Sequence, residues 1–309
     1  MAINNRFWVW PWEMKQHGLL GINARNLNML FRQNDRSRYP MVDNKVLTKE
    51  ICRRYGIRTP ETYAVISRYG DIKNIRECLK PYSEAVIKPA HGSGGEGILL
   101  LKSLCSEKAK TPDGSFLSEV DIRYHISGIL SGLYSLGGQT DSAIIEQYIN
   151  LHPVFSRIIG IGMPDIRIIT FKCRPVMSML RLPTQTSKGK ANLHQGGVGV
   201  GVNIEDGITT HAIHNGQIIS CHPDTGVVMK NIKIPFWDDI LDIAIRFSKA
   251  VEMGYIGVDI VIEAVNGPVV LEANARPGLS IQLANRFGLL TGIHDCDEYG
   301  HTDNQDTLA

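Results

Sequence analysis

The sequence lacks any closely spaced pair of cysteines. Its six cysteines are scattered over 309 residues, and no two of them are separated by only two residues. This spacing excludes the common zinc-binding and redox motifs and gives no sign of a disulfide framework. Because unpaired cysteines are typical of reducing compartments, we predict a cytoplasmic protein.

Long apolar runs are also missing. No segment reaches the roughly 18–20 apolar residues that a membrane-spanning helix needs. The first residues show no basic region followed by an apolar core. We therefore expect neither a membrane span nor a secretory signal.

An excess of charge of one sign is absent as well. The chain has 33 Lys and Arg against 31 Asp and Glu, a formal net charge of +2. So small a charge does not favour a nucleic-acid or membrane partner, and we expect neither. Hydrophobic residues make up 43% and charged residues 21% of the chain, which is typical of a soluble globular protein. The length permits one large domain or two ordinary ones.

What is present begins with an aromatic-rich N-terminus. Residues 7–12, FWVWPW, hold three Trp and one Phe. Aromatic side chains bring a large area to bury, so we predict an arm that packs onto the body of the protein. The alternative is a contact surface for a protein partner or for a second copy of the chain.

Helical and strand patterns alternate irregularly along the chain, and several strands read as hairpins. This arrangement predicts an α+β fold rather than a doubly wound parallel sheet. The clearest helix is expected at residues 236–254, where apolar residues recur at helical spacing. Further helices are expected at residues 13–34, where Gly18 and Gly21 interrupt the pattern, and at residues 45–56, 71–80 and 117–136.

Residues 257–278, GVDIVIEAVNGPVVLEANARPG, place polar residues in two otherwise apolar strands. Asn266 and Gly267 predict a hairpin with a two-residue turn. Such a turn would place Asp259 directly opposite Asn274 on the neighbouring strand.

Because side chains alternate between the two faces of a strand, Asp259, Glu272 and Asn274 would share one face. Two carboxylates and an amide that converge need a counter-charge, and oxygen ligands suit Mg²⁺ or Mn²⁺. We therefore predict a metal site. The alternative is the solvated polar face of an antiparallel sheet.

Lys88 ends a short apolar strand directly before a loop with four glycines in residues 92–97. Glycines such as Gly94 and Gly95 let backbone N–H groups converge on an anion. A buried lysine is costly without a nearby negative charge. These features predict a phosphate site, with an ordinary hairpin turn as the alternative.

A second glycine-rich run follows Arg181, Lys190, Asn192 and His194. Cationic and amide donors beside a flexible backbone fit an anionic substrate or a transferred phosphate. The alternative is a mobile surface loop.

Asp165 and Arg167 alternate within the strand DIRIIT and so share one of its faces. From the residues alone they are interpreted as a surface ion pair, worth less than ~1 kcal/mol.

These motifs together resemble the ATP-grasp superfamily, and within it the alpha-L-glutamate ligase (RimK-type) branch. The resemblance covers residues 41–293, through DNKVLTKEICRRYGIRTPET, VIKPAHGSGGEGI, IIEQYI, DIRIIT, KANLHQGG and GVDIVIE…GPVVLEANARPGL. It implies two α+β subdomains that grip ATP. Residues 41–150 would carry the lysines and the glycine flap, and residues 151–295 the metal and phosphate site. Residues 1–40 would form the aromatic-rich arm and a helix, and residues 296–309 a polar tail.

Two departures accompany the resemblance. Members of this branch carry a Rossmann-like domain before the opening lysine, whereas only about 40 residues precede it here, too few for a domain. Arg276 stands where the branch usually has a small residue. We therefore expect an ATP-grasp protein without a full N-terminal Rossmann-like domain.

The resemblance also implies roles for individual residues. The two lysines and the flap would hold the phosphates, and the segment around IIEQYI would form the adenine hinge. The implied ATP contacts are Lys45, Lys88, Gly94, Gly95, Glu146, Gln147, Tyr148, Ile149, Asp165, Lys190 and Asn192, and the implied magnesium ligands are Asp259, Glu272 and Asn274.

The implied reaction is amide formation. A carboxylate substrate, glutamate or another amino acid, attacks the γ-phosphate of ATP to give an acyl phosphate, and an amine acceptor then displaces phosphate. Arg276 would stabilise the transferred phosphoryl group, Arg181 would bind the carboxylate, and Asn192 would lie beside the phosphates. Two other functions fit the same motifs: a kinase or phosphotransferase, and a nucleotide-binding partner module without activity.

Overall fold

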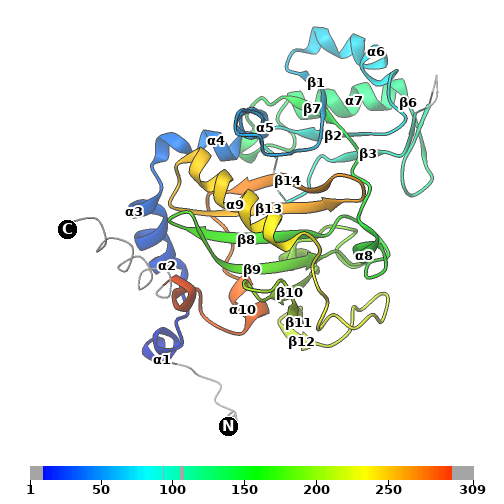
Figure 1. Ribbon diagram of the computed structural model, residues 1–309. Coiled ribbons are helices and arrows are strands. Elements are labelled where there is room, and N and C mark those ends of the chain that lie inside the picture. Colours follow the sequence, from blue (N-terminus) through cyan, green and yellow to red (C-terminus); the bar gives the residue numbers. More distant parts are fainter. Residues whose placement is uncertain (1–9, 93, 105–107, 294–309) are drawn as a thin grey trace. The chain divides into compact units, whose positions relative to one another are not determined.

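The structure is a computed structural model that describes residues 10–92, 94–104 and 108–293 (Figure 1). Tertiary contacts divide the chain into two compact units. The first unit comprises residues 40–152 and 262–272, and the second comprises residues 1–39, 153–261 and 273–309. The predicted polar tail lies outside the described residues, as do residues 7–9 of the aromatic-rich stretch. The described Trp10 and Trp12 are exposed rather than packed onto the body of the protein as predicted.

The first unit is built around a four-stranded antiparallel sheet with the strand order β1-β7-β2-β3. Helix α7 (Glu119–Leu130) packs its buried isoleucines against the core of this sheet. The helix begins where Ser118 and Asp121 accept hydrogen bonds from each other's backbone N–H groups. The four strands are β1 (Thr62–Ile66), β2 (Ala85–Pro89), β3 (Leu99–Leu101) and β7 (Ala143–Glu146).

Helix α5 places Lys45 at its first position, and the preceding residue fixes where the helix starts. The Oδ1 atom of Asn44 accepts hydrogen bonds from the backbone N–H groups of Val46, at 2.9 Å, and of Leu47, at 3.3 Å. These bonds satisfy donors that have no partner within the helix. The other elements of this unit are α4 (Pro40–Asp43), α5 (Lys45–Arg54), α6 (Ile75–Leu79) and the small sheet of β4 (Ser103–Leu104), β5 (Lys108–Lys110) and β6 (Phe116–Ser118).

The substitution Asn44→Ala is expected to lower the free energy of unfolding by about 1 kcal/mol, because the two capped N–H groups lose their acceptor. Asn74→Ala is the matched control, since Asn74 precedes α6 without a side-chain cap, and its effect should stay within ~0.5 kcal/mol. Urea unfolding of both variants measures the difference. Equal losses of unfolding free energy in the two variants would contradict the assignment of Asn44 as the N-cap of α5.

The second unit contains most of a seven-stranded sheet with the order β12-β11-β10-β9-β8-β13-β14. Helix α9 (Trp237–Val251) packs against β8, and α10 (Ile281–Asn285) packs against β9, β10 and β11. The outer part of the β13–β14 hairpin, residues 262–272, belongs to the first unit. The strands are β8 (Asp165–Phe171), β9 (Arg174–Leu182), β10 (Val198–Val202), β11 (Thr209–His214), β12 (Gln217–Ile219), β13 (Tyr255–Glu263) and β14 (Gly267–Asn274), and a short helix α8 (Pro153–Ser156) precedes them.

Helices on antiparallel sheets confirm the predicted α+β class, although one predicted turn differs. The helical stretch at residues 13–34 is interrupted at Gly18, as the sequence predicted. The φ of Gly18 is +68°, a conformation that favours glycine and ends a helix. The pieces are α1 (Pro11–Gln16), α2 (Ile22–Ala24), a π-helical turn (Arg25–Leu30) and α3 (Phe31–Gln33).

The predicted two-residue turn at Asn266-Gly267 is wrong. Strand β13 ends at Glu263 and β14 begins at Gly267, so residues 264–266 form the turn. The Glu263 carboxylate accepts a hydrogen bond from the backbone N–H of Asn266 at 2.8 Å. A two-residue type I′ turn needs positive φ at both central residues, but of these two only Gly267 has it, at +76°.

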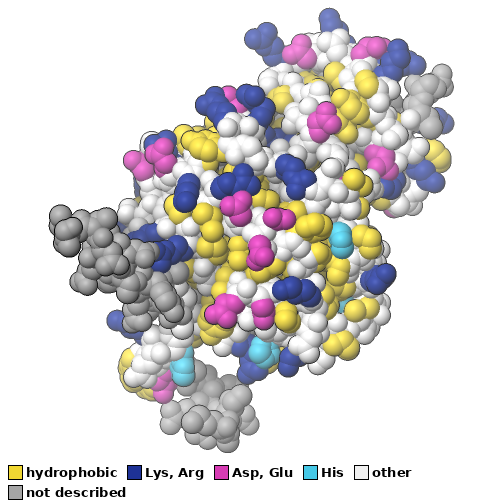
Figure 2. All heavy atoms as spheres, in the orientation of Figure 1, with side chains coloured by type: hydrophobic (Ala, Val, Ile, Leu, Met, Phe, Trp, Pro, Cys, Tyr) yellow, Lys and Arg dark blue, Asp and Glu magenta, His cyan; other side chains and the backbone are white. Residues whose placement is uncertain are grey.

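No described helix is both long enough and apolar enough to cross a bilayer. On the face drawn in Figure 2, Lys and Arg side chains are interspersed with Asp and Glu. This mixture agrees with the small net charge of the sequence.

Candidate functional site

The first unit holds a buried group of two lysines and one glutamate on strands β2 and β7 and helix α5. The Nζ atom of Lys88 lies 2.5 Å from Glu146 Oε1, and Nζ of Lys49 lies 2.7 Å from Oε2. In the β2–β7 register Val86 faces Glu146 and Lys88 faces Ile144, so Lys88 and Glu146 are diagonal neighbours on one face. The group has a net positive charge and is suited to an anion.

Burial tends to raise the pKa of Glu146, but Lys88 and Lys49 outweigh burial and hold that pKa below its ordinary value. Burial lowers the pKa of Lys49, and Glu146 opposes this change. Glu146 is therefore a charged residue that keeps two ammonium groups in place. The predicted contact between Glu146 and ATP stays a prediction.

The lowered pKa of Glu146 predicts how stability depends on pH. A carboxylate with a lowered pKa stabilises the folded state above its ordinary pKa, about 4.5, and this contribution is lost as the pH falls through the folded-state pKa. Glutamine mimics the protonated acid, so Glu146→Gln should be markedly less stable than wild type at neutral pH and should converge with it in acid. Urea unfolding across this range measures the difference. For the exposed pair of Glu77 and Lys80, Glu77→Gln should differ from wild type by no more than ~0.5 kcal/mol throughout.

Lys45 lies at the start of α5, beside the first residues of the glycine flap. Its backbone N–H donates to Ala90 O at 3.0 Å, and its Nζ donates to Gly92 O at 2.5 Å. Its Nζ also lies 3.8 Å from a Glu272 carboxylate oxygen. Burial lowers the pKa of Lys45, an effect that Glu272 opposes.

The described part of the flap comprises His91, Gly92 and residues 94–98. Gly94, Gly95 and Gly97 have φ values of +64°, +76° and +71°, which L-residues with side chains rarely adopt. The glycines are therefore required by the backbone path, which fits both the phosphate-site hypothesis and its hairpin-turn alternative. The contacts of Gly94 and Gly95 with ATP stay predictions.

The second unit holds a buried charge network on β8, β9, β13 and β14. Arg167 binds Asp259 through Nε, at 2.7 Å, and through an NH2 donor, at 2.6 Å. Arg181 donates to Asp165 at 2.6 Å and to Asp259 at 2.6 Å. The sheet register explains the pairs, because Arg167 lies opposite Asp259 and Arg181 lies opposite Asp165. Asn274 Nδ2 donates to Asp259 Oδ2 at 3.1 Å.

The two acids of this network differ in pKa. Burial raises the pKa of Asp165 to about 7, although Arg181 opposes the rise. Burial also acts on Asp259, but Arg167 and Arg181 together lower its pKa to about 2. The interpretation of Asp165 and Arg167 as a surface pair is therefore wrong: both are buried, and each binds a different partner.

The predicted metal ligands fit a hard cation in their chemistry. Asp259 Oδ2 already accepts from Arg167, Arg181 and Asn274, whereas Oδ1 accepts from Arg167 Nε. Within the described part of the chain Arg167 Nε is the one donor to Oδ1, which leaves Oδ1 a lone pair for an ion. Asn274 directs its amide nitrogen rather than its oxygen at Asp259. Glu272 lies two positions before Asn274 on β14, so both face the same way. No cluster of three or more His, Cys, Asp or Glu suited to a metal occurs in the described part of the chain, and the predicted set has two acids and an amide.

The adenine-hinge residues follow β7. Gln147 exchanges two hydrogen bonds with Glu61: its backbone N–H donates to Glu61 O at 2.8 Å, and its Oε1 accepts from Glu61 N–H at 3.2 Å. Lys102 Nζ lies 4.2 Å from the centre of the Tyr148 ring, and Ile149 is buried. The two hydrogen bonds to Glu61, the residue directly before β1, therefore fix the position of Gln147.

The second glycine-rich run is a capped turn rather than a loop without structure. Asn192 Oδ1 accepts from His194 N–H at 3.0 Å, and Asn192 O accepts from Gly197 N–H at 3.0 Å. Gly196 has a φ of +92°.

Elsewhere in this unit, the Arg276 guanidinium lies 4.5 Å from the centre of the Tyr39 ring. The phosphate contacts of Lys190 and Asn192 and the role of Arg276 stay predictions.

Sequence reasoning missed Lys49 and the true partners of Arg167. Lys49 was detectable, because it lies four residues after Lys45 on one helix and residues at that spacing share a face. The pairing of Arg167 depends on the β8–β13 register, which joins residues 92 positions apart.

The fold and the match to a family model define an ATP-grasp protein, as the motifs predicted. The chain belongs to the sugar-transfer-associated ATP-grasp family, whose sequence model matches residues 24–298. The predicted superfamily is thereby confirmed, and the glutamate ligase branch stays a prediction. No curated protein matches the sequence.

Two solved structures with TM-scores of 0.51 support the fold. D-alanine–D-alanine ligase from Bacillus anthracis is 14% identical with a TM-score of 0.51, over 89% of this chain and 72% of that one. D-alanyl-alanine synthetase A from Vibrio cholerae O1 is 9% identical with a TM-score of 0.51, over 86% and 66%. The ATP-grasp ligase PsnB, in complex with a minimal precursor, is 13% identical with a TM-score of 0.48, over 85% of this chain, which spans 62% of PsnB.

Proposed function

We propose that this protein is an ATP-dependent carboxylate–amine ligase that works through an acyl phosphate. The observation that carries the proposal is the buried group of Lys49, Lys88 and Glu146, with Lys45 bound to the carbonyl of Gly92 in the same unit. Three ammonium groups outnumber the one buried acid, and a glycine-rich flap follows Lys88 in sequence. Such a site is suited to the phosphates of ATP.

In the proposed reaction, an oxygen of a substrate carboxylate attacks the γ-phosphorus of ATP. The bond between the γ-phosphorus and the bridging oxygen breaks, and ADP leaves. An amine nitrogen then attacks the acyl carbon, its carbon–oxygen bond to phosphate breaks, and the amine proton passes to solvent. A magnesium ion, when bound, would offset the charge of the phosphates.

The residues contribute position and charge. Lys45 and Lys88 hold phosphates, Lys49 shares the Glu146 carboxylate, and Arg276 stabilises the transferred phosphoryl group. Arg181 donates to both Asp165 and Asp259, so we assign it to orienting Asp259 rather than to binding the substrate carboxylate. Such preorganised charge supplies most of the acceleration in phosphoryl transfer.

Asp259, Glu272 and Asn274 are the residues that would hold the ion. Glutamate is the first candidate for the carboxylate substrate because of the resemblance to glutamate ligases. Since the family is associated with sugar transfer, amines on sugars belong among the acceptors to be tried.

The test is ADP release from ATP with pairs of amino acids and amines, followed by mass spectrometry of the product. Hydroxylamine should trap the acyl phosphate as a hydroxamate. ADP release with a stable phosphoester and no hydroxamate would instead show a phosphotransferase. ATP binding without consumption in any pairing would show a binding module.

A further inference from the structure

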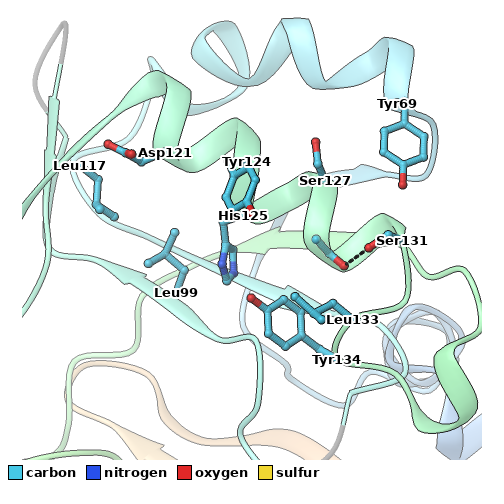
Figure 3. Close-up of a pocket in the computed structure, with 11 residues that line it drawn as sticks. Tyr69, Leu99, Leu117, Asp121, Tyr124, His125, Ser127, Ser131, Leu133 and Tyr134 are labelled. Carbon is cyan, nitrogen blue, oxygen red and sulfur yellow. Dashed lines mark hydrogen bonds between the residues drawn. The ribbon is translucent and has the colours of Figure 1, made fainter.

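The glycine flap is anchored at both of its described ends, to helix α7 and to the segment between α7 and β7. At the far end, Nε2 of His125 lies 3.0 Å from Gly97 O. The Tyr134 ring packs so closely on Gly97 that a Cβ there would lie 2.5 Å from a ring carbon. Figure 3 shows His125 and Tyr134 side by side in a hollow lined also by Leu99 and Tyr124. No side chain larger than hydrogen fits at Gly97.

At the near end the anchor is Asp141, whose side chain is fully buried. Its carboxylate accepts from the backbone N–H of His91 at 3.0 Å and from Ser142 N–H at 2.7 Å. It also accepts from the Ser135 hydroxyl at 2.6 Å and lies 2.8 Å from His91 Nδ1. Ser135 in turn forms a β-bridge with Gly92. One carboxylate therefore joins the start of the flap to the segment after α7.

Only a carboxylate satisfies this arrangement. Four donor positions converge on Asp141, and an ionised carboxylate accepts at every position without offering a hydrogen. An asparagine would direct its NH₂ group at one or more of these donors. Burial tends to raise the pKa of Asp141, but the hydrogen bonds from Ser135, His91 and Ser142 outweigh burial and lower that pKa.

The anchored residues lead directly to Lys45. Gly92 follows His91, and its carbonyl accepts the hydrogen bond from Lys45 Nζ at 2.5 Å. The Lys45 backbone N–H is bound to Ala90, on the other side of His91. The position of the Lys45 ammonium therefore depends on the path of residues 90–92, and that path depends on Asp141.

We propose that Asp141 is a positioning residue for nucleotide binding: it fixes His91 and Gly92, and through the Gly92 carbonyl it fixes the ammonium group of Lys45. This role rests on the proposed function, in which Lys45 contacts a phosphate of ATP. Asp141 itself does not touch the nucleotide.

The test compares Asp141→Asn with wild type by two measurements. Calorimetry with a non-hydrolysable ATP analogue and Mg²⁺ gives the dissociation constant, which should rise about tenfold or more, as expected when hydrogen bonds to a buried charge are lost. Amide hydrogen exchange of a peptide covering residues 88–92 should become faster. In turnover assays the KM for ATP should rise more than kcat falls, because the reacting groups remain in place.

Two further variants keep the test decisive. Ser135→Ala removes one of the four donors and should shift both measurements in the same direction by less, so it replaces Asp141→Asn if that variant does not fold. Asp113→Asn is the matched control, because Asp113 accepts from Ser115 N–H in an exposed turn of the small sheet. It should leave the dissociation constant and the exchange of residues 88–92 unchanged.

Wild-type affinity in Asp141→Asn, with or without faster exchange, would overturn the positioning role while leaving the proposed function intact. If wild type itself binds no nucleotide, the proposed function and this role both fail. The exchange measurement would then still report whether Asp141 anchors residues 88–92.

Discussion

Replacement of Lys88 by methionine is expected to abolish ATP turnover and to destabilise the first unit. Methionine keeps the length of the side chain but removes the ammonium group that lies 2.5 Å from Glu146. Loss of a single preorganised charge at a phosphoryl-transfer site costs on the order of 10²–10³ in rate. Because Glu146 then keeps only Lys49, the free energy of unfolding should fall by about 3 kcal/mol.

Two further variants separate these effects of Lys88. In the double variant Lys88→Met with Glu146→Gln the buried acid is neutral, so stability should largely return while turnover stays absent. Lys80→Met removes an exposed lysine paired with Glu77 and should change stability by less than ~0.5 kcal/mol. ADP release and urea unfolding measure both quantities. If Lys88→Met turned over ATP at the wild-type rate, Lys88 would have no role in the proposed ATP site.

Asp259→Asn is expected to have the largest effect in the second unit. The substitution leaves Arg167 and Arg181 buried with one counter-charge fewer, and breaking a buried ion pair typically costs about 3–5 kcal/mol. If Asp259 is a metal ligand, the variant should also need far more Mg²⁺ for ATP turnover. A magnesium titration of ADP release and a urea unfolding curve measure the two effects.

Asp165→Asn is the informative comparison for Asp259→Asn. Asp165 binds Arg181 but is not a predicted metal ligand. Because burial raises its pKa to about 7, the neutral asparagine should change stability much less than Asp259→Asn does and should leave the magnesium dependence unchanged. Asp242→Asn breaks an exposed pair with Arg246 and should cost less than ~0.5 kcal/mol. The same magnesium dependence in Asp259→Asn and wild type would contradict the metal assignment.

The fold was predictable from the sequence where local rules decide it. Asn44 before an amphipathic segment marks the start of α5, and apolar periodicity marks α9, which ends at Val251 because Glu252 takes a φ of +53°. Because side chains alternate between the two faces of β14, Glu272 and Asn274 share one face, whichever residues form the hairpin turn. These features depend on neighbours within a few residues, so a single sequence carries them.

The turn of the β13–β14 hairpin was predicted wrongly because two local signals compete there. Asn266-Gly267 favours a two-residue turn, but the Glu263 carboxylate binds the backbone N–H of Asn266 and supports a three-residue turn. Even so, Asn274 contacts Asp259 as the hairpin hypothesis expected.

The sequence by itself determined the motifs that mark an ATP-grasp protein, the flap glycines and the polar residues of β13 and β14. Only the tertiary structure decided which charges meet: Lys49 and Lys88 at Glu146, and Arg167 and Arg181 at Asp259. Each of these pairs joins different elements, and two of them follow from strand register. The physical reason is that a buried charge is stable only beside its partner, and the position of that partner is set by how the elements pack.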